Sequence, residues 1–109
     1  MEFQTLIQKA QVLRDEFALQ EARRGKRWGL TEHFQGFVGD VGDLGKLIMA
    51  QQGLRPGSDI DKRLVHELAD CLWSILIIAD ELHIDLEQGF LATMEDLRAS
   101  AKDAREHSL

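Results

Sequence analysis

Apolar residues recur at intervals of three and four along most of this chain, which is the spacing of one face of an amphipathic α-helix. The first such segment runs from about Glu2 to Arg24 and is followed by Gly25, a residue that commonly ends helices. The second segment begins near Thr31, a residue type that caps helix N-termini well, and continues to about Gln52. The pattern therefore predicts two helices in the first half of the chain.

Turn-forming residues at 53–58 separate these helices from a third, which extends from about Asp59 to Leu82. Apolar residues cover most of its circumference, as is typical of a central helix or of one in an oligomer interface. Asp85 and Gln88 have capping-box spacing and begin a fourth helix. Without any repeat or linker, we predict one all-α domain over residues 1–109, a four-helix bundle with short connections.

The second predicted helix carries a glycine at every third position of its middle part. These glycines are Gly36, Gly39, Gly42 and Gly45. Each one costs a helix about 1 kcal/mol relative to alanine. We therefore expect another backbone or a ligand to approach this helix closely, with plain irregularity of the segment as the alternative.

The overall composition excludes several classes of protein. A net charge of −6 argues against non-specific binding to nucleic-acid polymers. Cys71 is the single cysteine, so no intramolecular disulfide is possible and a reducing compartment is expected. Residues 1–10 lack the apolar run of a signal peptide, and the most apolar stretch, residues 72–79, is too short to cross a bilayer. We expect a cytoplasmic protein without a membrane partner.

Two pairs of acidic residues stand among apolar ones on consecutive helices. Asp40 and Asp43 form the first pair, and Glu67 and Asp70 form the second. A spacing of three places the two acids of a pair about 60° apart around a helix and about 4.5 Å apart along it. Each pair taken alone is also typical of a solvated helix edge. Two pairs inside apolar surroundings indicate instead that the four carboxylates converge.

Converging carboxylates repel one another, and burying them is costly unless something neutralises their charge. Protonation is one remedy, and a divalent cation is another. Oxygen ligands favour Mg²⁺, with Mn²⁺ as a possibility, and Mg²⁺ usually keeps positions open for water and substrate phosphates. The acid pairs therefore predict an open metal site suited to a polyphosphate.

Two stretches of this chain resemble the all-α nucleoside triphosphate pyrophosphohydrolases, a superfamily that includes MazG and the dCTP pyrophosphatases. Val38–Leu44 and His66–Asp70 are similar to its signature, an E-x-x-E pair followed at variable distance by an E-x-x-D pair. Glu67 and Asp70 match the second pair as it stands. Residues 75–79 and 83–86 resemble the MazG and dCTP pyrophosphatase branches, and the likeness extends over residues 28–97.

The resemblance implies a MazG-like four-helix fold that forms a homodimer or tetramer. It also implies a Mg²⁺-dependent enzyme that cleaves a (deoxy)nucleoside triphosphate into the monophosphate and pyrophosphate, with a role in clearing surplus or non-standard nucleotides. The implied catalytic and metal-binding residues are Asp40, Asp43, Glu67 and Asp70.

The chain departs from this family in two respects. Its first pair consists of aspartates, which are one methylene shorter than the usual glutamates, and Thr93–Leu97 lack the Lys and Asn with which some relatives hold phosphates. The remaining candidates for substrate contacts are three cations and two ring side chains: Lys46, Arg98, Lys102, Trp28 and His33. The alternative function is a catalytically degenerate MazG-like module for interaction or nucleotide sensing, or a purely structural helical oligomer.

Overall fold

A computed structural model describes residues 2–107, so the ends of the predicted domain, residue 1 and residues 108–109, lie outside the described part. Residues 2–107 form four α-helices and no strand: α1 (Phe3–Arg23), α2 (Leu30–Gln51), α3 (Ile60–Glu81) and α4 (Leu86–His107). The all-α prediction is confirmed, and each predicted boundary of the first three helices lies one residue from the observed one. None of these helices combines the length and apolarity needed to cross a membrane.

Two of the predicted helix ends are made by the residues that the sequence indicated. Gly25 ends α1 in the left-handed region, with φ of +70°, and its N–H donates to the carbonyl oxygen of Ala22 at 3.1 Å. The carboxylate of Asp85 accepts a hydrogen bond from the N–H of Gln88 at 3.1 Å and so caps the start of α4.

The start of α2 differs from the prediction. Gly29, in place of Thr31, is the N-cap residue. The carboxylate of Glu32 reaches back and accepts a hydrogen bond from the Gly29 N–H at 3.3 Å. An acid in the first turn thereby binds the N–H of the N-cap residue, whereas the hydroxyl of a threonine N-cap would have accepted from an N–H inside the first turn.

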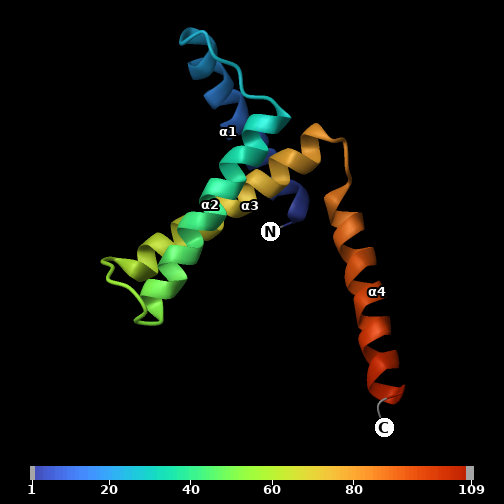
Figure 1. Ribbon diagram of the computed structural model, residues 1–109. Coiled ribbons are helices and arrows are strands. Elements are labelled where there is room, and N and C mark those ends of the chain that lie inside the picture. The colour runs from blue at the N-terminus through green and yellow to red at the C-terminus, as the bar shows by residue number, and fades with distance from the viewer. Residues whose placement is uncertain (1, 108–109) are drawn as a thin grey trace.

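α3 is the central element of the molecule (Figure 1). α2 packs against it as the antiparallel partner in a helical hairpin, and α1 packs across it. The core lies where α1 meets α3: Ile77 is fully buried, next to Leu76 and Ala10. A ring of partly buried side chains packs around these three, namely Phe3, Leu6, Ile7, Trp73 and Leu86.

α4 leaves this body and extends away from it (Figure 1). The turn at residues 82–85 contains His83 in the left-handed region, with φ of 57°, and α4 carries no buried residue. The radius of gyration is 17.9 Å, whereas a compact domain of this length has about 13 Å. Within one chain the four helices therefore do not close into a bundle.

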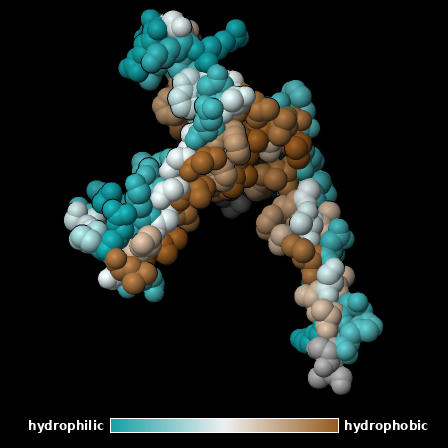
Figure 2. Space-filling model, viewed as in Figure 1, coloured by the Kyte–Doolittle hydropathy of each residue, from teal (hydrophilic) through white to brown (hydrophobic). Residues whose placement is uncertain are grey.

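Large apolar side chains remain exposed on all four helices. Figure 2 shows them gathered over the middle of the molecule and along the side of α4 that faces the body. On α3 they include Val65, Leu68, Leu72 and Ile75; on α4 they include Phe90, Leu91, Met94 and Leu97. On α4, Phe90, Met94 and Leu97 have the spacing of a single helix face.

The glycines of α2 lie in two different surroundings. A Cβ added at Gly36 would lie 3.4 Å from Cζ3 of Trp28, so the expected close approach is found there, made by an aromatic ring. A Cβ at Gly39, Gly42 or Gly45 would meet nothing within 4 Å. Open space therefore adjoins these three glycines in the described chain.

An ion pair joins α1 to α3 beside the core. Arg14 Nη1 lies 2.6 Å from Asp80 Oδ2, and Gln11 Nε2 donates to Asp80 Oδ1 at 2.8 Å. The hydrogen bond from Arg14, more than any other contact, holds the pKa of the Asp80 carboxyl below its usual value of 3.8. The ionised form of Asp80 therefore stabilises the folded protein.

We expect Asp80→Asn to lower the free energy of unfolding at pH 7 by about 1 kcal/mol, a figure reduced for partial solvent screening. Since the pKa of Asp80 is lowered, its contribution is fully present above about pH 4 and is lost as the pH falls through the lowered value. The difference in free energy of unfolding between wild type and D80N should therefore become smaller below about pH 4. Urea unfolding at several pH values measures it.

Asp15→Asn is the matched control, because Asp15 also pairs with Arg14, at 3.4 Å, but its side chain is 73% exposed. It should change stability by less than half as much. An equal loss of stability in D80N and D15N would contradict a stabilising role for ionised Asp80. A loss of stability in D80N that does not depend on pH would contradict it too.

Candidate active site

The antiparallel pairing of α2 and α3 brings the two acid pairs together. Asp43 and Glu67 lie equally far along the chain from the loop residue Arg55, and so do Asp40 and Asp70. In a helical hairpin such residues lie opposite each other. Carboxylate oxygens of Asp40, Asp43 and Glu67 lie within 4.8 Å of one another. The two pairs therefore converge as their spacing predicted, while their roles stay a prediction.

The cluster is poorly solvated at its centre. Glu67 Oε2 is buried and has no hydrogen-bond partner among the described residues. Burial, followed by the charges of Asp70, Asp40 and Asp43, raises the pKa of Glu67 above its usual 4.5. Burial and then Asp70 and Asp43 likewise raise the pKa of Asp40 above 3.8. Each of these carboxylates resists ionisation because its neighbours and its surroundings disfavour negative charge.

A small divalent cation fits this cluster. Two ligands on opposite sides of Mg²⁺ are about 4.2 Å apart, given bonds of about 2.1 Å. A spread of at most 4.8 Å among the oxygens of Asp40, Asp43 and Glu67 is close to that span, so small side-chain rotations suffice. The buried oxygen of Glu67 would gain the partner that it lacks. The donor set consists of carboxylates, as hard cations prefer.

Asp70 occupies the edge of the cluster and has a partner of its own. His66 Nε2 lies 3.1 Å from Asp70 Oδ2, one turn apart on α3. His66, Glu67 and Asp70 also present ligand atoms within 4.8 Å of one another. His66 was not among the site residues predicted from the sequence; its spacing of four from Asp70 is the signal that places the two side chains together.

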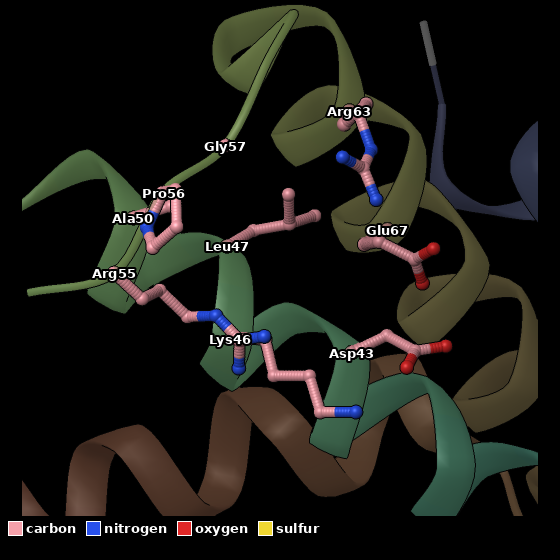
Figure 3. A pocket seen from close by; sticks show the side chains of 9 residues that line it. All are labelled: Asp43, Lys46, Leu47, Ala50, Arg55, Pro56, Gly57, Arg63 and Glu67. Atoms are coloured by element: carbon pink, nitrogen blue, oxygen red, sulfur yellow. The ribbon is translucent and has the colours of Figure 1, made fainter.

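A pocket of about 240 Å³ opens on the loop side of the acid cluster (Figure 3). Asp43 and Glu67 form one wall, and three cationic side chains, Lys46, Arg55 and Arg63, surround the rest. Lys46 was a candidate from the sequence, whereas Arg55 and Arg63 were not. Arg63 stands one turn before Glu67, and that spacing could have indicated it.

A groove of about 540 Å³ opens on the other side of the cluster, between α1 and α3. Asp40 and Asp70 lie on its border, whereas its walls are mainly apolar and include Leu13, Phe17 and Trp73. Phe17 and Trp73 meet edge to face with ring centroids 5.8 Å apart. The acid cluster thus separates a cationic pocket from an apolar groove.

The other substrate-contact candidates lie away from the acids. His33 is buried near the start of α2, between the rings of Trp28 and Trp73, with Nε2 3.2 Å from Glu81 Oε1. This is a packing position. Arg98 and Lys102 line a shallow surface depression on α4, the helix that leaves the body. Within one chain, α4 does not bring these two cations to the acid cluster.

The arrangement can hold a hard cation beside a cationic pocket, which is what binding a metal–polyphosphate complex requires. No protein-family model matches this sequence, and no curated protein or solved structure matches it significantly.

Glu67→Gln should stabilise the metal-free protein by about 1 kcal/mol, since it removes one of several like charges a few ångströms apart. The sign follows from the raised pKa of Glu67: the ionised form is disfavoured in the fold, so stability falls as the pH rises above its usual 4.5. The variant should melt higher than wild type in EDTA, but gain less on addition of MgCl₂.

Scanning fluorimetry in EDTA and in MgCl₂ measures both effects. Asp61→Asn, an exposed acid in the first turn of the same helix, is the control and should leave the response to Mg²⁺ unchanged. A melting temperature of wild type that Mg²⁺ does not shift would contradict a cation site at this cluster.

Proposed function

We propose that this protein is a Mg²⁺-dependent nucleoside triphosphate pyrophosphohydrolase. The observation that carries the proposal is the convergence of Asp40, Asp43 and Glu67 around a buried, unpaired carboxylate oxygen. The adjoining pocket with three cations supports an anionic substrate. The MazG-like spacing of the two acid pairs supports a triphosphate as that substrate.

In the proposed reaction, water attacks the α-phosphorus of the triphosphate. A bond forms between the water oxygen and this phosphorus, and the bond from it to the oxygen that bridges to the β-phosphorus breaks. That oxygen leaves with the bonding electrons as part of pyrophosphate, and the nucleoside monophosphate remains. The water releases its protons to a carboxylate and then to solvent.

The carboxylates divide this work. Glu67, with its buried oxygen, and the nearer aspartate oxygens would hold the metal, and one member of the Asp40/Asp43 pair would orient the water and accept its proton. Bound Mg²⁺ supplies neutralisation of phosphate charge and a lowered pKa of water. Asp70, whose Oδ2 lies 3.1 Å from His66 Nε2, would be the remaining carboxylate ligand of the metal beside Glu67.

The proposal includes self-association into a homodimer or tetramer. An extended protomer with an exposed apolar stripe on α4 leaves much apolar surface in water, more than a stable monomer of this size usually tolerates. A second copy in the open angle between α4 and the body would cover this surface (Figure 2). Four-helix packing would then form between chains.

The enzyme proposal predicts pyrophosphate release from at least one member of a panel of canonical and modified nucleoside triphosphates, in MgCl₂ but not in EDTA. Glu67→Gln should lower kcat at least about 100-fold, the scale of losing a metal ligand or base. Asp61→Asn should match wild type. If the whole panel is inert, or E67Q retains full turnover, the enzyme proposal fails; Mg²⁺ binding without turnover would favour the degenerate sensing module.

The association proposal predicts a solution mass of at least twice the 12.4 kDa of one chain, measured by light scattering. The double variant F90K/M94K should reduce that mass, because it places charge on the α4 stripe. Both side chains are exposed in one chain, so its own core stays intact. Leu54→Lys, at a loop position that is 72% exposed, is the control. A monomeric wild type would contradict association.

A further inference from the structure

We infer that Lys46, Arg55 and Arg63 form the binding site for the leaving pyrophosphate end of a triphosphate substrate. This inference rests on the proposed function and adds to it the orientation of the substrate: the β- and γ-phosphates lie toward the loop between α2 and α3. The site is the pocket of Figure 3, which adjoins the acid cluster through Asp43 and Glu67.

The size of the pocket suits a polyphosphate end better than a whole nucleotide. Its volume of about 240 Å³ lies below the range of about 300–1,000 Å³ that drug-sized ligands occupy. A group that enters it must be small and polar, because cations and carboxylates form much of its lining. Two linked phosphates meet both conditions.

The three cations are available to a ligand. Among the described residues, Lys46, Arg55 and Arg63 make no ion pair within 4.0 Å, although two carboxylates share the pocket with them. In Figure 3 the cationic groups surround the pocket from α2, the loop and α3. Arginine forks and an ammonium group are the usual partners of phosphate oxygens. Negative charge on the ligand would complete their pairing.

Tight packing of the loop at Gly57 restricts where the backbone of Arg55 lies. A Cβ added at Gly57 would lie 3.0 Å from Cβ of Ala50 on α2 and 3.4 Å from Cγ1 of Ile60 on α3. The loop therefore lies directly against both helices, and the absence of a side chain at Gly57 favours that close approach. Arg55, two residues earlier, extends from an anchored segment and not from a free one.

The opposite side of the acid cluster offers no comparable place for phosphates. The groove bordered by Asp40 and Asp70 has mainly apolar walls, and Lys9 is the one cation that lines it in the described chain. Phosphate oxygens placed there would lose water without gaining partners. The polarity of the two openings therefore determines which end of the substrate faces the loop.

Isothermal titration with inorganic pyrophosphate in MgCl₂ tests this assignment directly. The double variant R55Q/R63Q should bind pyrophosphate more weakly, by at least about 10-fold for each arginine removed. Each substitution removes a charge-assisted hydrogen bond to the ligand. It should also raise KM for the best triphosphate of the panel. Lys62→Gln is the matched control, because Lys62 neighbours Arg63 but does not line the pocket.

The outcomes separate this inference from the proposed function. Unchanged pyrophosphate affinity in R55Q/R63Q overturns the pocket assignment, even if the enzyme turns over triphosphates. A weakened affinity in a protein that hydrolyses no triphosphate supports a polyphosphate site and removes the enzyme. A wild type that binds no pyrophosphate in MgCl₂ overturns the assignment. Melting curves confirm that the variant is folded; if it is not, R63Q alone is read in the same way.

Discussion

The repulsion among carboxylates that the α2–α3 hairpin holds together is the constraint on which the site depends. A short loop joins two long antiparallel helices, so Asp43 must face Glu67. At 4.8 Å, two full charges repel by about 1 kcal/mol in water and by about 3 kcal/mol at an effective dielectric constant of 20, and the exposure of Asp43 keeps its share near the lower figure. A small domain has only about 5–15 kcal/mol of net stability. Three ionised carboxylates at this distance would consume a large share of it, so the fold favours whatever neutralises them.

The cations and the carboxylates beside this cluster do not neutralise one another through direct ion pairs. Lys46, Arg55 and Arg63 share a pocket with Asp43 and Glu67, yet none of these cations forms an ion pair among the described residues. Direct salt bridges would have relieved the repulsion at low cost. Unpaired charges of both signs, side by side, are complementary to a ligand that also carries both, as a magnesium polyphosphate does.

The sequence predicted those features that depend on local periodicity. Helix boundaries and the convergence of Asp40, Asp43 and Glu67 follow from spacing and from the shortness of the connecting loop. Arg55 was harder to predict than Lys46 or Arg63, because its position depends on how the loop packs at Gly57 against α2. The direction of α4 could not be predicted at all: it follows from the backbone at His83, and an amphipathic stripe does not indicate whether its partner is in the same chain.

The short side chain of Asp43 and the missing side chain at Gly39 both affect how close a cation can come to α2. Aspartate is one methylene shorter than glutamate, so a cation held by Asp43 must lie nearer to the backbone of α2. Gly39 stands one turn before Asp43 on the same helix face, and a Cβ there would meet nothing within 4 Å. A larger side chain at this position would fill part of that open space. The helix thus gives up some intrinsic stability at Gly39, and in the proposed metal site the open space there would leave room for a hydrated ion and its phosphates.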